Sequence, residues 1–209
     1  MIIATDENLG VHASKTYQFI CIFCPVASYY QSGIEPVKIY VEHDFKRAVK
    51  GGTGFAKTAA NYAQSLKSQE EAEEAGYAQV LWLDAIERKY IEEVGSMNIM
   101  FVIDGTVVTP ELNGSILPGI TRASALELLR DKGYKVEERK LSIDELIEAA
   151  QAGKLDEAFG TGTAAVISPV GEILHNGKNY IINNGKIGPV AQDIYDRIKK
   201  SQYGKIEDK

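Results

Sequence analysis

The chain has 209 residues, of which 44% are hydrophobic and 25% charged, so it is long enough to bury a sizeable core in one or two domains. Its net charge of -6 gives no basic footprint for nucleic acid or for an anionic membrane. No apolar run approaches the roughly 20 residues that span a bilayer, and the N-terminus lacks a signal-peptide pattern, so we expect a cytoplasmic protein.

The first patterned segment, residues 17–24, is β-branched and aromatic and predicts a strand. It contains both cysteines, Cys21 and Cys24, whose spacing suits a redox pair or half of a zinc site. Residues three apart on a strand point to opposite faces, however, and there is no second cysteine pair. We therefore predict two thiols buried in a core. The three histidines are scattered along the chain, and no metal site is predicted.

Later strand-like segments cover residues 37–41, 79–83, 99–103 and 135–138. A helix is predicted over 58–75 from an apolar stripe that would form its buried face, namely Ala59, Tyr62, Ala63 and Leu66. Gly76 would end this helix.

A second helix is predicted after Thr121, with Gly133 as its stop. A third begins at Ser142, where Ser142 and Glu145 are spaced as a capping box. Further apolar stripes are predicted to be buried: Ile143, Leu146, Ile147 and Ala150 in the third helix, and Val190, Ala191, Ile194, Tyr195 and Ile198 in a last one. The interleaved strands and helices predict an α/β or α+β fold, followed by a polar tail over 201–209.

Lys57 is the first candidate for chemistry. It follows a glycine run and is flanked by Phe55, Ala56, Ala59 and Ala60. A lysine in apolar surroundings loses some preference for its charged form, and a neutral amine forms a Schiff base with an aldehyde. The alternative is a solvated lysine at the start of a helix.

Three further segments are candidates for binding. Glu93 lies between apolar Ile91 and Val94, as either a carboxylate aimed at a cationic ring nitrogen or a turn glutamate between strands. The Pro-Gly turn within 115–122 leads into a helix N-terminus, which can bind an anion. The segment 159–165 is either a second anion-binding turn or a glycine-rich bend in a strand. A reactive lysine, a buried acid and two anion-binding turns are together what an aldehyde-phosphate cofactor requires.

In order and wording, five motifs resemble the branched-chain amino-acid aminotransferases: 50–62 (KGGTGFAKTAANY), 79–84 (QVLWLD), 93–98 (EVGSMN), 117–122 (LPGITR) and 160–165 (GTGTAA). These are class IV aminotransferases that use pyridoxal 5'-phosphate and have the D-amino-acid aminotransferase-like fold, fold type IV. The resemblance implies an α/β large domain built on a mixed sheet or barrel with flanking helices. It also implies transfer of the amino group of leucine, isoleucine or valine to 2-oxoglutarate in a homodimer.

The resemblance implies a role for each matching residue. Lys57 would bind the cofactor covalently and move the substrate proton, Glu93 would pair with the pyridine nitrogen, and Tyr62 would bond the phenolic oxygen. The other implied cofactor-binding residues are Asn98 and, around the phosphate, Leu117, Gly119, Ile120, Thr121, Thr163 and Arg47. The implied substrate-binding residues are Tyr29, Gln79, Ser96, Met97, Thr163, Ala164, Leu9 and Val11, the last two reached across a dimer interface.

The chain also departs from the family pattern. Ala165 and Ser168 stand where some relatives have a redox cysteine pair. The family has a smaller N-terminal domain ahead of the matching segments, so we expect residues 1–200 to be an isolated cofactor-binding domain with little or no activity alone. Alternatives are a D-amino-acid aminotransferase, an aminodeoxychorismate lyase, or a non-catalytic dimerising fragment.

Overall fold

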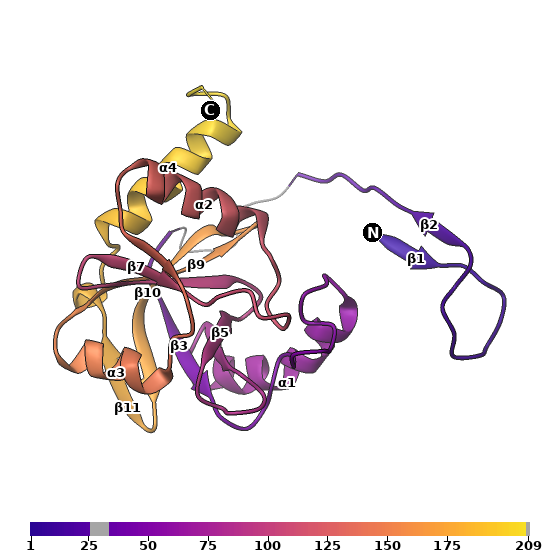
Figure 1. Cartoon of the computed structure of the whole chain (residues 1–209), viewed down its shortest axis with the longest axis horizontal. Helices are drawn as coiled ribbons and strands as arrows, with labels where there is room; N and C mark the ends of the chain where they lie inside the picture. The colour runs from indigo at the N-terminus through magenta and orange to yellow at the C-terminus, as the bar shows by residue number, and fades with distance from the viewer. Residues whose placement is uncertain (26–33, 208–209) are drawn as a thin grey trace.

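A nine-stranded mixed sheet organises the described residues, 1–25 and 34–207, of this computed structural model (Figure 1). Its strand order is β5-β4-β3-β10-β9-β6-β7-β8, and β11 pairs with β10. The strands are β3 (Val37–Glu42), β4 (Gln79–Leu83), β5 (Ile91–Val94), β6 (Asn98–Ile103), β7 (Thr106–Thr109), β8 (Val136–Glu138), β9 (Leu155–Gly162), β10 (Val166–His175) and β11 (Lys178–Ile181). Parallel pairs, such as β3 with β4, occur beside antiparallel ones, such as β9 with β10, which confirms the predicted α/β class with a mixed sheet.

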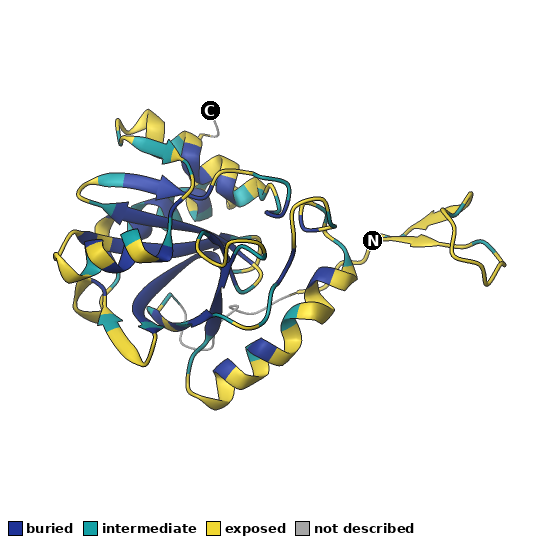
Figure 2. Cartoon of the chain, turned by 60° about the horizontal axis from the view of Figure 1, so that its bottom comes forward, coloured by how far each residue is buried: buried dark blue, intermediate teal, exposed yellow. Residues whose placement is uncertain are grey.

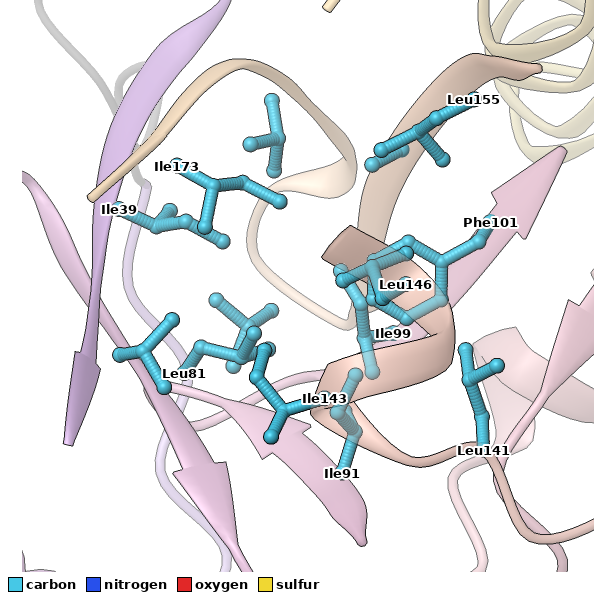
Figure 3. Packing of buried hydrophobic residues seen from close by; sticks show 14 of the residues in the cluster. Ile39, Leu81, Ile91, Ile99, Phe101, Leu141, Ile143, Leu146, Leu155 and Ile173 are labelled. Atoms are coloured by element: carbon cyan, nitrogen blue, oxygen red, sulfur yellow. The ribbon is translucent and has the colours of Figure 1, made fainter. Parts of the chain in front are cut away.

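Helices cover the sheet and divide the core into clusters. Helix α3 (Ile143–Gln151) contributes to the largest, where Leu146 packs with Ile99, Phe101 and Ile173 (Figure 3). Helices α2 (Ile120–Asp131) and α4 (Pro189–Gln202) share a second cluster with β6, β7, β9 and β10. Helix α1 (Ala59–Glu74) packs on β3 and β4 through a third, small cluster around Trp82. A 3-10 turn, η1 (Asn183–Gly185), precedes α4. No helix in the described parts of the chain is long and apolar enough to cross a membrane.

The predicted buried face of α1 is wrong, although the helix and its stop at Gly76 are confirmed. The buried residues are Asn61, Ser68 and Ala72, whereas Leu66 is 66% exposed. Polar bonds orient the helix, because Ser68 Oγ donates to buried Glu42 and Asn61 bonds the loop before the helix. The apolar stripe therefore faces solvent in this structure (Figure 2).

The prediction of core thiols is also wrong. Only Tyr17–Phe19 of the predicted strand is regular, as β2, and it pairs with β1 (Ile2–Ala4) in a separate two-stranded sheet. Both strands are exposed along their whole length, and the hairpin stands away from the body (Figures 1 and 2). Cys21 and Cys24 follow β2 and are free and exposed, because none of the described core elements covers this segment.

The predicted helix ends are largely confirmed. Ser142 caps α3 by accepting from the backbone N–H of Glu145 at 3.1 Å, but the second half of the capping box is not formed. The carboxylate of Glu145 instead pairs with Arg139 at 2.6 Å. Gly133 has the positive φ of a helix stop after α2. The predicted tail begins too early, since α4 continues to Gln202.

Candidate active site

The candidate motifs meet at two adjoining cavities that share Lys57, Glu93, Ser96 and Leu117. The first cavity is otherwise lined by Arg47, Gly54, Ala56, Asn61, Tyr62, Ser65 and Gly95. The second is otherwise lined by Asn98, Gly119, Ile120, Thr121, Thr161, Gly162 and Thr163. Segments more than 100 residues apart in the sequence are thus brought together, because β5, the start of β6, the turn before α2 and the β9–β10 turn converge here.

Lys57 lies in the loop just before α1. Its Nζ donates to the hydroxyl of Tyr62 at 2.7 Å and lies 5.2 Å from the centre of that ring. Tyr62 is one turn into the helix, so the helix start fixes the spacing of the pair. The predicted apolar surroundings of Lys57 are not borne out: Lys57 is exposed, as are Phe55 and Ala60.

Asn61 is a residue that the sequence interpretation missed. Its side chain is buried and donates to the backbone carbonyls of Thr53, at 2.9 Å, and Ala56, at 2.8 Å. It therefore holds the loop that carries Lys57 in shape. The signal that could have revealed it is an asparagine in the first turn of a helix that follows a glycine run, where a short amide readily bonds local backbone.

Glu93 is on β5, opposite Trp82 of β4, so the alternative of a turn glutamate is wrong. It is 3% exposed, and its Oε1 accepts from the backbone N–H of Leu117 at 2.8 Å. Its Oε2 lies 3.3 Å from Nε of Arg47. Burial raises the pKa of Glu93 to about 7, against the attraction of Arg47 and the Leu117 hydrogen bond, which both lower it.

The turn before α2 forms the floor of the second cavity. Gly119 is the extended N-cap residue of α2 and makes no side-chain cap bond. Asn98 Nδ2 donates to the carbonyl of Leu117 at 2.8 Å, and a Cβ at position 119 would overlap Asn98 Oδ1. A side chain at position 119 would therefore require the Asn98 amide to shift. Ile120 is exposed, and Thr121 is half-buried at the start of the helix.

The end of β9, with Thr161 and Gly162, and the turn into β10, with Thr163, also line the second cavity. Thr161 is buried, and its Oγ1 has no hydrogen-bond partner among the described residues. The sequence interpretation missed Thr161, although it belongs to the same glycine-threonine motif. Ala164 is exposed and lines neither cavity.

Several predicted pocket residues lie beside the cavities rather than in their lining. Gln79 is buried behind Gly95, where a Cβ would overlap the Gln79 side chain. Met97 is also buried, in the core cluster, and packs against Gly160 and Gly162. Both support the cavity walls from behind.

The other predicted contacts lie farther away or on another side. Arg47 lines the cavity of Tyr62 and does not line the one formed by Thr121 and Thr163, which separates it from the expected phosphate end. Leu9 and Val11 are fully exposed on the N-terminal hairpin. Tyr29 lies outside the described residues.

The family profile described as amino-transferase class IV matches residues 1–173. The chain belongs to the class IV aminotransferase family. Branched-chain-amino-acid aminotransferase 2 of Bacillus subtilis is 61% identical over 207 residues, which are 99% of this chain and 57% of that protein. The chain thus spans just over half the length of this curated relative.

Solved structures agree with this family and with fold type IV. The crystal structure of the Escherichia coli branched-chain amino acid aminotransferase matches with a TM-score of 0.82 at 31% identity, covering 100% of this chain and 66% of that one. The branched-chain aminotransferase from the thermophilic archaeon Thermoproteus uzoniensis, solved with norvaline, matches with a TM-score of 0.73 at 30% identity, covering 88% and 56%.

Proposed function

We propose that this class IV aminotransferase chain binds pyridoxal phosphate through Lys57 and takes part in amino transfer from leucine, isoleucine or valine to 2-oxoglutarate. The observation that carries the proposal is that the two adjoining cavities share part of their lining, including Lys57 and Glu93. One amine, one buried carboxylate and one free helix N-terminus face the same space. Each matches a different functional group of the cofactor.

The phosphate end fits the second cavity. The first N–H groups of α2 have no partner within the helix, and the helix dipole favours an anion there. Within α2, which is described throughout, no acidic side chain occupies the first turn. The orphaned Oγ1 of Thr161 can donate to a phosphate oxygen, and Thr121 and Thr163 line the same cavity. The residues present therefore fit a phosphate group.

The ring end fits Glu93, which is available to accept a hydrogen bond from a protonated ring nitrogen. Bound pyridoxal phosphate supplies an aldehyde carbon and an electron-accepting ring. Lys57 would provide the amine that holds such a carbon, and once the substrate's amino group had replaced it there, the freed amine could carry a proton to and from the substrate Cα. The hydroxyl of Tyr62 holds Nζ of Lys57 at 2.7 Å and so orients it. Gln79, Met97 and Asn98 position the wall around these groups.

The choice of substrate rests on the relatives, two of which in Bacillus subtilis are 61% and 56% identical and are named for branched-chain amino acids. We assign Ser96 and the β9–β10 turn, with Thr163 and Ala164, to the substrate side of the site. We also propose a cytoplasmic homodimer in which residues 1–200 form the cofactor-binding domain. Leu9 and Val11 would contact substrate only through such a partner, since both are exposed.

Borohydride reduction in the presence of pyridoxal phosphate, followed by peptide mapping, tests the proposal. We expect a pyridoxyl group on Lys57, with no label at this position in Lys57→Ala. The matched control is Lys50→Ala, which removes an exposed lysine of the same loop and should leave the Lys57 label intact. Labelling spread evenly over surface lysines would contradict the proposal. For a labelled chain, transamination assays with L-leucine, D-alanine and aminodeoxychorismate then separate the branched-chain activity from others of this fold.

A further inference from the structure

Arg47 is a buried cation in contact with Glu93. It is 6% exposed and comes from the loop after β3, whereas Glu93 is on β5. The guanidinium contacts two groups at once. Nε lies 3.3 Å from Glu93 Oε2, and Nη2 donates to the backbone carbonyl of Ser115. One side chain thus joins the loop, the strand and the turn that leads to α2.

The arrangement fixes the Glu93 carboxylate from both sides. Oε1 accepts from the N–H of Leu117, two residues beyond the carbonyl that Arg47 holds. Close packing keeps the turn in place, because a Cβ on Gly54 would overlap the carbonyl of Ser115. The carboxylate, the arginine and the turn are therefore joined by one ion pair and two hydrogen bonds.

The electrostatics depend on Arg47 as well. Four groups act on Glu93: Arg47, the Leu117 N–H and Lys57 lower its pKa, and Glu92, the preceding residue of β5, raises it. Arg47 is the strongest of the three that oppose burial. A buried carboxylate that loses its cation is left with an uncompensated charge and takes up a proton instead.

We infer that Arg47 is a positioning residue that acts through Glu93, fixing this carboxylate at the ring end of the site and favouring its ionised form, and not a phosphate ligand. The inference rests on the proposed function, because an ionised Glu93 matters only if it pairs with a cationic ring nitrogen of the cofactor. Placement supports it: Arg47 lines the cavity of Tyr62 and not the cavity at the N-terminus of α2.

Carbon-13 NMR of the glutamate carboxyls in the 209-residue chain without cofactor tests the inference, with the Glu93 signal assigned by its loss in Glu93→Gln. We expect Arg47→Met to raise the pKa of Glu93 by about 1 to 3 units and Arg47→Lys, which keeps the charge, to raise it less. Arg122→Met is the matched control, since Arg122 is a second buried arginine that bonds a carbonyl and pairs with Glu138. It should leave the Glu93 titration unchanged.

A second measurement needs no change at Arg47. The nitrogen-15 signal of Arg47 Nε should shift with pH at the midpoint of Glu93 in the unaltered chain, and this shift should vanish in Glu93→Gln. The inference would be overturned if the pKa of Glu93 were unchanged in Arg47→Met, or if the Arg47 Nε signal of the unaltered chain did not change with pH. Neither readout involves cofactor, so failure here is distinct from failure to label Lys57, which would count against the proposed function.

Discussion

Glu93→Gln provides a direct test of the electrostatics at the site. Gln has the same shape as Glu and keeps an acceptor for the N–H of Leu117, but it cannot ionise. The variant therefore removes the proton equilibrium of one buried group and leaves the packing nearly unchanged. The quantity of interest is the pH dependence of the free energy of unfolding, measured without cofactor.

The sign and size follow from linkage. The pKa of Glu93 rises from 4.5 to about 7 on folding because burial outweighs Arg47, Leu117 and Lys57. Between these two values the unfolded chain has lost the proton and the folded chain keeps it, so stability falls as pH rises. Since one pKa unit corresponds to about 1.4 kcal/mol, the shift corresponds to about 3 kcal/mol of stability, lost between pH 4.5 and pH 7.

The assay is urea unfolding at several pH values from 4.5 to 8, with the Glu93→Gln curve subtracted from the wild-type curve. We expect a difference that falls by about 3 kcal/mol and levels off above pH 7. Glu138→Gln gives a control with a constant difference over this range, because Arg130 and Arg122 lower the pKa of Glu138 and its contribution is lost only as pH falls below 4.5. A flat wild-type minus Glu93→Gln difference would refute the reasoning, since it would mean that the groups that lower the pKa of Glu93 cancel the effect of burial.

Other predictions follow from single contacts. Gly119→Ala should weaken cofactor binding in an absorbance titration and lower the free energy of unfolding by about 1 to 3 kcal/mol, because the new Cβ overlaps Asn98 Oδ1. Adding Asn98→Ala to this variant should restore part of the lost stability. Tyr62→Phe removes the hydroxyl that accepts a 2.7 Å hydrogen bond from Nζ of Lys57, and it should lower cofactor affinity about fivefold. An unchanged affinity would argue against a role of Tyr62 in orienting the amine. Ser142→Ala should cost about 1 kcal/mol in urea unfolding and leave cofactor binding unaffected, since it only uncaps α3.

Elements marked by a regular spacing of apolar residues, or by glycine and proline at their ends, were predictable from the sequence. Strand β4 was predicted with the bounds it has, and Gly76 and Gly133 take the positive φ expected of helix stops. The turn into α2 was recognisable because a Pro-Gly pair precedes a helical pattern. These signals are local, so a single sequence carries them in full.

What failed depends on partners that are distant in the sequence. The face of α1 is chosen by the buried contact between Ser68 and Glu42, which no periodicity in residues 58–75 reveals. Cys21 was expected in a core because its neighbours are apolar, yet composition does not say which element covers a strand. The family resemblance supplied the roles that we propose for Lys57 and Glu93. The link from Arg47 to Glu93 became visible only in three dimensions.

The exposed hairpin has a practical use in the laboratory. Cys21 and Cys24 are the two cysteines of the chain, and both lie free at its surface on a segment separate from the sheet. Thiol-specific fluorophores or spin labels will therefore attach beside β2 without any engineered cysteine. Such a label reports on the environment of the hairpin, and neither cysteine is among the described residues that line the two cavities around Lys57, so an approach of the hairpin to a partner chain can be followed with the site itself unlabelled.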